Sequence, residues 1–460
     1  LIEITKTNVE LQKVIAYESG FENLLSIIES EGLANGGIVV QDCLTLINNL
    51  LSNNVSNQNQ FREMNCIKRL PDLLAIDPSD LWTLSDDKKD ILNLTLSAVS
   101  SLLSSPSATP VTVQTVPSPK DSTSTLTVTS ALSSQIQSTQ TQLGIHRVHA
   151  RVIDLALGDL KAPTVRIKAM WCLGDLIFDH PKNRTFLEQH DFKAAQGNGR
   201  VSAMLKVTQV LFTSKIPMEA LAAHHVLKCY FHNNPEGQRI FAAPICSPHA
   251  ASPSSTASSN PTNPQQQLQS DLNETYPGRL IAKNLLSWQT HNDMARTFHA
   301  AMVLGYILES NAGVKAQLLK HLVADGGAQP ENIFAKLLKS LMHALQANSE
   351  LPIIIAFLRV LGIWCDEFPA AVAQLRSTPT NLNVLQDLAK QQGVSLHIGG
   401  LAAYLFGLCI DVATEFQAMG PEASNAITTK LEQLRRTTEF LQAERGGARL
   451  HDEESKLPFF

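Results

Sequence analysis

Apolar residues recur every three or four positions along most of the chain, and strand-like alternation is nearly absent. A period near 3.6 residues places such side chains on one face of a helix. Glycine and proline interrupt the pattern at intervals, as at Gly32, Pro181 and Gly393, and predict helix ends. The pattern therefore predicts an all-α protein. Examples of the spacing are Leu11, Val14 and Ile15; Ile281, Leu285 and Leu286; and Ile333, Leu337, Leu338 and Leu341.

One arrangement returns five times along the chain. An apolar helix ends, a short polar turn follows, and an aromatic residue or a leucine anchors the next helix. The anchors are Phe61, Phe186, Phe241, Leu318 and Leu375. Once polar insertions are set aside, their spacing indicates a unit of roughly 45–55 residues, near the ~40–47 of armadillo and HEAT repeats. We therefore expect an armadillo/HEAT-like right-handed superhelical solenoid, which offers an extended binding surface rather than one deep catalytic pocket.

Two polar stretches interrupt the helical pattern. Residues 104–142 are rich in Ser, Thr and Pro, and residues 244–275 in Ser, Pro, Asn and Gln. Such compositions bury too little apolar surface to offset chain entropy, so both predict disordered insertions. Across 422–446, apolar positions step by four and three residues, which predicts a terminal helix that packs on the solenoid. Its stripe is Ile427, Leu431, Leu434, Thr438 and Leu441.

The segment boundaries suggest one folded body. We expect residues 1–460 to form a single armadillo-like globular head that contains the two insertions. The chain begins at Leu1 in text that already has a helical pattern. We therefore expect it to be a fragment of a longer protein.

The charge balance constrains the partners. The 460 residues carry 37 Lys+Arg against 42 Asp+Glu, for a net charge of −5. A general nucleic-acid binder needs excess basic residues to neutralise phosphates, so that class is disfavoured, as is docking on anionic lipid by charge alone. Seven scattered cysteines without a C-x-x-C pair are typical of buried thiols in a reducing compartment. No apolar run reaches the ~18 residues that span a bilayer.

Catalytic motifs are missing from the sequence. It contains no phosphate-binding P-loop, no G-x-S-x-G and no H-E-x-x-H. His225, Cys229 and His232 share one helical face at a spacing that could hold a metal. A structural zinc site takes four ligands, however, and apolar residues surround these three, so core packing is the better interpretation. The sequence predicts a protein that is not an enzyme and holds no cofactor.

The segment from Gly36 to Asn59 is unusually rich in side-chain amides. Asn53, Asn54 and Asn57 stand at a helix break, where asparagine is a good N-cap. Capping is the first interpretation, and a polar ladder exposed on a binding groove is the second. Armadillo import receptors use a different ladder, an array of Trp-x-x-x-Asn pairs. Of the four tryptophans only Trp288 has such a partner, Asn292, which disfavours an import receptor.

The same region carries a family resemblance. Its stretches, together with weaker continuations further along, resemble the Uso/transcytosis-associated protein family, the general vesicular transport factors that tether vesicles between endoplasmic reticulum and Golgi. The resemblance covers most of the chain outside the two polar stretches. It implies the armadillo-like head of a protein that continues into a dimeric coiled coil and an acidic tail. The stretches are residues 12–22, 27–32, 36–44, 48–51, 56–58 and 61–63, then 166–172, 276–278 and 430–440.

The resemblance implies a function and partners. It implies a cytoplasmic protein, peripheral on Golgi, ER-derived vesicle and ER–Golgi intermediate membranes, that docks vesicles before fusion in ER-to-Golgi and intra-Golgi transport. The implied partners are a Rab-family GTPase of the early secretory pathway, Golgi matrix proteins, the oligomeric Golgi tethering complex and SNAREs, with a homodimer formed through the coiled coil. The alternative is another armadillo adaptor, such as a nuclear import receptor or a catenin-like scaffold.

The resemblance also suggests a partner-binding block. The family's second homology block corresponds to residues 36–63 and is associated with partner binding. The candidate residues within it are Gly36, Gly37, Asp42, Asn48, Asn49, Asn53, Asn57, Gln58, Phe61, Arg62 and Glu63.

Overall fold

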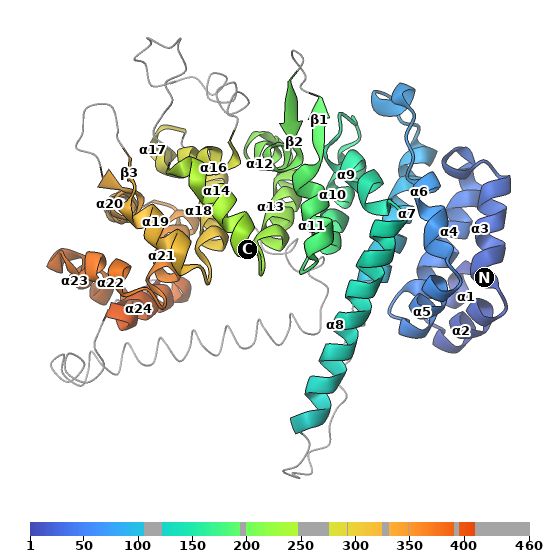
Figure 1. Cartoon of the computed structure of the whole chain (residues 1–460), viewed down its shortest axis with the longest axis horizontal. Helices are drawn as coiled ribbons and strands as arrows, with labels where there is room; N and C mark the ends of the chain where they lie inside the picture. The colour runs from blue at the N-terminus through green and yellow to red at the C-terminus, as the bar shows by residue number, and fades with distance from the viewer. Residues whose placement is uncertain are drawn as a thin grey trace. The chain divides into compact units, whose positions relative to one another are not determined.

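The structure is a computed structural model that describes residues 1–104, 122–193, 199–246, 276–291, 293–323, 331–347, 349–390 and 395–409. Its described part divides into two compact units. The first unit holds residues 1–210 and 214–232, and the second holds residues 211–213 and the described residues from Asn233 onward. Both units consist mainly of helices (Figure 1).

In the first unit, long central helices of successive repeats pack side by side. These are α4, α7, α10 and α13, and each contacts the next along the chain. The short helices α5 and α11 follow α4 and α10, and the longer helix α8 comes after α7. The helices of this unit are α1 Ile2–Thr5, α2 Val9–Tyr17, α3 Gly20–Ser30, η1 Leu33–Asn35, α4 Gly37–Leu51, α5 Val55–Glu63, η2 Cys66–Arg69, α6 Leu70–Leu73, η3 Pro78–Leu81, α7 Asp86–Leu103, α8 Ser122–Ile145, α9 Val148–Leu157, α10 Pro163–Ile177, α11 Pro181–Gln189, α12 Ala203–Thr213 (with its last three residues in the second unit) and α13 Pro217–Phe231.

The second unit repeats this plan. Its central helices α18, α21 and α24 pack in sequence, and α14, α19 and α22 are the short helices beside them. The helices are α14 Pro235–Ile245, α16 Pro277–Leu286, α17 Trp288–His291, α18 Met294–Leu308, α19 Ala312–Lys320, α20 Ile333–Gln346, α21 Leu351–Cys365, α22 Pro369–Arg376, α23 Pro379–Lys390 and α24 Leu396–Cys409.

Two short antiparallel hairpins complete the described elements. In the first unit β1 (Asp191–Lys193) pairs with β2 (Arg200–Ser202), so that Phe192 lies opposite Val201. In the second unit β3 (Leu322–Val323) pairs with β4 (Glu331–Asn332).

The same tight corner joins five of the central helices, α4, α10, α13, α18 and α21, to the short helix that follows. One residue at the corner adopts positive φ, between 48° and 55°. The next residue is the N-cap of the short helix, and in four corners its side chain accepts a hydrogen bond from the backbone N–H three residues on. The left-handed conformation turns the chain sharply, and the cap satisfies one otherwise unpaired donor. The corner residues are Asn53, Asp179, Asn233, Ser310 and Glu367.

Large aromatic side chains fill the space between repeats. Phe21 packs edge-on against Phe61, with ring centroids 5.0 Å apart, and both are fully buried. In the second unit Phe334 packs edge-on against Trp364 at 5.4 Å. The anchors Phe61, Phe241 and Leu318 are likewise buried. These contacts explain why each repeat begins its short helix with a large apolar residue.

The all-α prediction is confirmed, and so are the five corners, but the insertion boundaries need correction. Helix α8 covers Ser122–Ile145, so the end of the 104–142 stretch is helical and its Thr139 and Gln140 are buried. Pro244 and Ile245 belong to α14 rather than to the 244–275 insertion. The remainder of these two stretches, 105–121 and 247–275, and the predicted terminal helix 422–446 lie outside the described residues.

Candidate functional site

The amides of the candidate block face inward. Asn57 and Gln58 are 1% and 3% exposed. Asn57 Nδ2 donates to the carbonyl oxygens of Leu50 (2.9 Å) and Gln12 (3.2 Å). Gln58 Nε2 donates to those of Leu51 (3.1 Å) and Ser101 (2.9 Å). Three of these acceptors, Leu50, Leu51 and Ser101, lie in the last turn of α4 or α7, where carbonyls lack a partner within their own helix.

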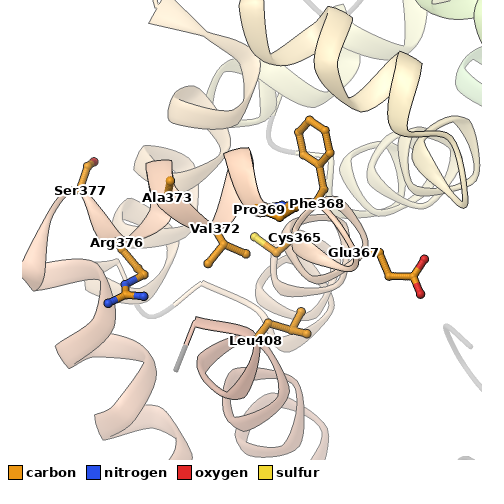
Figure 2. A pocket seen from close by; sticks show the side chains of 9 residues that line it. All are labelled: Cys365, Glu367, Phe368, Pro369, Val372, Ala373, Arg376, Ser377 and Leu408. Atoms are coloured by element: carbon orange, nitrogen blue, oxygen red, sulfur yellow. The ribbon is translucent and has the colours of Figure 1, made fainter. Parts of the chain in front are cut away.

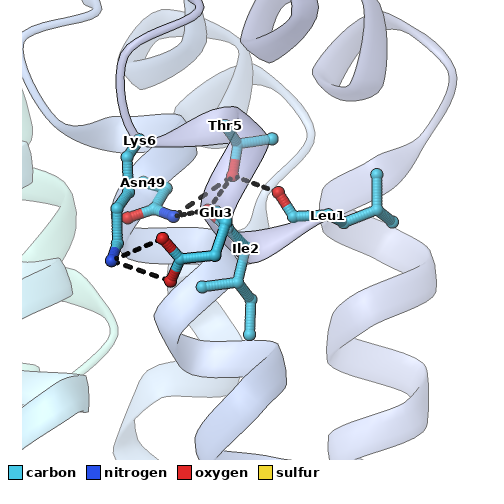
Figure 3. A network of polar contacts seen from close by, with 6 residues as sticks. All are labelled: Leu1, Ile2, Glu3, Thr5, Lys6 and Asn49. Carbon is cyan, nitrogen blue, oxygen red and sulfur yellow. Dashed lines mark hydrogen bonds and ion pairs between the residues drawn. The ribbon is translucent and has the colours of Figure 1, made fainter.

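Asn48 and Asn49 make the same kind of contact along the side of α4. Asn48 Nδ2 donates to Leu44 O and Leu94 O, each at 2.9 Å. Asn49 Nδ2 donates to Ile2 O at 2.9 Å and to Thr5 Oγ1 at 3.1 Å (Figure 3). Asn48 thus ties α4 to α7, and Asn49 ties it to α1. These are internal bonds, not a ladder presented to a ligand.

The aromatic and basic members of the block are also interior. Phe61 is buried against Phe21. Arg62 is 9% exposed, and its Nη1 donates to Thr139 Oγ1 of α8 at 2.7 Å. Burial lowers the pKa of Arg62 from its ordinary value. This side chain therefore joins two neighbouring short helices.

Seven candidates remain wholly or partly accessible, among them the half-buried Asn48 and Asn49. Asp42, Asn53 and Glu63 are exposed, while Gly36 and Gly37 are half-buried at the start of α4. Gly37 has a φ of +61°, a conformation that favours glycine. The structure thus places six of the eleven candidates in contacts between its own elements. The most exposed candidates are the acidic side chains and Asn53.

The contact made by Gln58 recurs through both units. Arg184, Gln238 and Lys315 occupy the same fourth position after the N-cap of their short helices. Arg184 Nη1 donates to His232 O (2.6 Å), and Lys315 Nζ donates to Asp366 O (2.7 Å). Gln238 Nε2 donates to Tyr306 O (2.9 Å) and Glu309 O (3.0 Å). We call each such bond, from a short helix to the end of the next repeat's central helix, a carbonyl clamp.

Helix α8 supplies one more clamp. Gln140 Nε2 donates to Asp175 O (2.9 Å) and Phe178 O (2.8 Å), at the end of α10. The sequence pattern had not predicted this role for Gln58 or for the residues at the equivalent positions. The feature of the sequence that could have revealed this role is a long polar side chain at the fourth position after the N-cap of four short helices. Burial lowers the pKa of both Arg184 and Lys315 from their ordinary values, because each cationic side chain is enclosed between helices.

The His225 region forms a buried contact between α10 and α13. His225 Nε2 lies 3.2 Å from Asp175 Oδ1, and the ring packs against Trp171 with centroids 4.4 Å apart. Burial is the largest influence on the pKa of His225 and lowers it, but Cys229 and Asp175 together raise it to about 10. Gly174 makes room for the ring, because a Cβ there would lie 2.3 Å from His225 Cδ2.

These contacts give no support to a metal site on α13. His232 turns away to stack on Phe178, with centroids 4.6 Å apart. Within the described ranges, no three His, Cys, Asp or Glu side chains are grouped so that they could hold a metal ion. Among the same residues, no helix combines the length and hydropathy needed to cross a bilayer.

A shallow groove of about 700 Å³ lies at the end of the second unit (Figure 2). Val372 and Ala373 of α22 form one wall, Leu408 of α24 forms the other, and Cys365 lies between them. Glu367 and Arg376 stand at its edge. The lining is largely apolar and holds no group of titratable side chains suited to catalysis.

These features together define a class of protein. It is a helical repeat scaffold whose polar side chains hold neighbouring repeats together. The family model described as the Uso1/p115-like vesicle tethering protein head region matches residues 193–456, more than half of the chain. The chain belongs to this family of vesicle tethering proteins, which is not a family of enzymes.

Relatives of known name agree with this assignment. The chain is 26% identical over 423 residues to Golgin candidate 6 of Arabidopsis thaliana, covering 89% of this chain and 42% of that protein. It is 25% identical over 417 residues to the human General vesicular transport factor p115, covering 88% of this chain and 37% of that protein. The chain therefore spans well under half the length of these relatives.

Solved structures support the fold. Two crystal structures of Uso1 match with TM-scores of 0.68 and 0.63, at 18% and 19% identity. They cover 98% and 94% of this chain, and 65% and 60% of the solved chains. The armadillo-like, all-α fold class is thereby confirmed.

Proposed function

We propose that this chain is the head of a non-enzymatic vesicle tether that acts in ER-to-Golgi and intra-Golgi transport. The observation that carries the proposal is the head-region match over residues 193–456. In this proposal the head recognises a Rab-family GTPase and works with Golgi matrix proteins, the oligomeric Golgi tethering complex and SNAREs to dock vesicles before fusion. The protein is cytoplasmic and peripheral on Golgi and vesicle membranes, and dimerises through a coiled coil outside this chain.

The accessible part of the 36–63 block is the proposed Rab-binding surface. Asp42 and Glu63 are exposed acids, and Asn53 is exposed at the corner between α4 and α5. The buried clamps hold these residues on rigid helices. Recognition by backbone turns and acidic side chains on a rigid scaffold is a common arrangement at specific protein interfaces.

The import-receptor alternative has less support. Trp288 is 8% exposed and packs against Phe357 and His343, so its ring is not available to grip a peptide. Trp171 and Trp364 are also buried. Asn292, the partner of Trp288 in the sequence motif, lies outside the described residues.

The test is binding of the purified chain to the early-secretory Rab-family GTPase loaded with a GTP analogue or with GDP. We expect preference for the GTP form, and at least a tenfold loss of affinity in the double variant Asp42→Lys, Glu63→Lys. The matched control is Asp387→Lys, an exposed acid on α23 that should leave binding unchanged. Equal binding of both nucleotide forms, or an equal loss in the control, would contradict the proposed surface.

A further inference from the structure

The groove between α22 and α24 lies where four earlier repeats have a clamp. Four short helices carry a polar side chain at the fourth position after the N-cap, and that side chain reaches the end of the next central helix. In α22 the N-cap is Phe368, so the same position is Val372. Val372 is apolar and lines the groove together with Leu408, near the end of the next central helix.

The repeat order indicates which element comes after α24. After α4, α10, α13, α18 and α21 the chain turns a corner and forms a short helix, and the short helix α14 contacts the next one, α19. Helix α24 is the last central helix described, and it ends at Cys409. The groove is therefore the face of α22 against which the next short helix of the array would pack.

We propose that residues 422–446 of this chain occupy the groove and complete the last repeat. The segment carries an apolar stripe of Ile427, Leu431 and Leu434 at helical spacing. An apolar stripe matches an apolar wall, which explains why the clamp position holds valine here rather than Gln, Arg or Lys. Burial of such side chains drives the contact.

Three further observations favour this occupant over an external one. The chain leaves the groove wall at Leu408 and Cys409, and an extended connection to Ile427 can span roughly 55 Å. Tethering raises the effective concentration of the segment to about the millimolar range. The family model runs to residue 456, so the segment is part of the head region.

The charges beside the stripe also fit the groove edge. Glu367 and Arg376 stand at the groove edge and carry opposite charges. The segment carries Lys430, Arg435 and Arg436 together with Glu432 and Glu439, on either side of the stripe. Both signs are therefore present on each partner, which allows complementary pairs at the rim.

Photo-crosslinking in the full chain tests the proposal. A photoreactive p-benzoylphenylalanine replaces Ala373, which is exposed and lines the groove. The control position is Arg359, exposed on α21 outside the groove. After irradiation at submicromolar concentration, mass spectrometry identifies the linked peptide. We expect an intramolecular link from position 373 to residues 422–446 at the mass of the monomer, and no such link from position 359.

Two double variants show whether the stripe makes the contact. Leu431→Asp with Leu434→Asp places charges on the stripe, and we expect at least a tenfold loss of crosslink yield. Thr429→Asp with Gln433→Asp adds the same charge on the opposite helical face, and the yield should stay within twofold of the parent. A link at twice the monomer mass would assign the groove to a second copy, and equal yields from positions 373 and 359 would leave it open to an outside partner. Either result overturns the proposal.

Discussion

The carbonyl clamp of Gln58 gives a quantitative prediction. In Gln58→Leu the side chain keeps a similar volume but loses both donors, so the bonds to Leu51 O and Ser101 O disappear. A buried hydrogen bond contributes about 0.5–1.5 kcal/mol net, and an acceptor left unpaired costs about 1–3 kcal/mol. Leu51 O still accepts from Asn54 N–H and Ser101 O from Ser104 Oγ–H, so neither acceptor is left unpaired. From the two lost bonds we expect a local loss of about 1–3 kcal/mol.

Hydrogen exchange followed by mass spectrometry measures this loss where it occurs. Because about 1.4 kcal/mol corresponds to a factor of ten, protection of the amides in residues 97–104 should fall by roughly 5- to 150-fold. Exchange is preferable to a single unfolding curve, since two compact units can unfold separately.

Two companion variants sharpen the interpretation. Gln58→Glu places a carboxylate opposite the same carbonyls, so at neutral pH it should be more damaging than Gln58→Leu. Ser56→Ala changes an exposed residue of the same helix and should have no effect. If protection in Gln58→Leu stays within threefold of the parent, the clamp does not stabilise the contact between repeats and the reasoning fails.

Three other outcomes are expected. Gly174→Ala should lower the stability of the first unit by ~1–3 kcal/mol, because its Cβ would overlap the His225 ring; an unchanged melting temperature would show that the ring can move aside. Gly278→Ala should cost more than Gly305→Ala in the same thermal assay, since one Cβ would lie 1.9 Å from Phe241 O, a backbone atom, and the other 3.0 Å from the flexible end of Ile363; equal costs would contradict this. The neighbours of His225 raise its pKa to about 10 against an ordinary value of ~6.5, so the stability from its charged ring is complete below about pH 6.5 and is lost as the pH rises toward 10. His225→Gln should flatten that part of the stability–pH profile measured by urea titration, and a profile identical to the parent would refute the assignment.

Helical periodicity was sufficient to predict the fold class, because each central helix buries one stripe of apolar side chains. The corners were also predictable, since caps and turn residues act within a few positions of one another. The helix in the Ser/Thr-rich stretch before Ile145 could not be predicted in this way. Its composition suggested disorder, yet Thr139 and Gln140 are buried because they bond to Arg62, Asp175 and Phe178, which are distant in the sequence.

The contacts of the candidate site were also not predictable from the sequence, because they join residues that are distant along the chain. Asn57 and Gln58 resemble exposed amides when only the sequence is considered, since polar side chains are usually found at the surface. Their acceptors are backbone carbonyls, which every residue type supplies. No residue type elsewhere in the sequence therefore indicates that these hydrogen bonds form. Only Asp42, Asn53, Glu63 and the glycine turn remain as surface features that the resemblance could have indicated.

The use of backbone carbonyls as the acceptors of the clamps has an evolutionary consequence. A clamp that bonds to a backbone carbonyl does not require a particular side chain on the neighbouring helix. The neighbouring repeat can therefore change its residues without a matching substitution. Two partners that had to mutate together would constrain each other, whereas here only the donor position is fixed in character. Chains that share about a quarter of their residues with this one can therefore keep such clamps while the side chains opposite them differ.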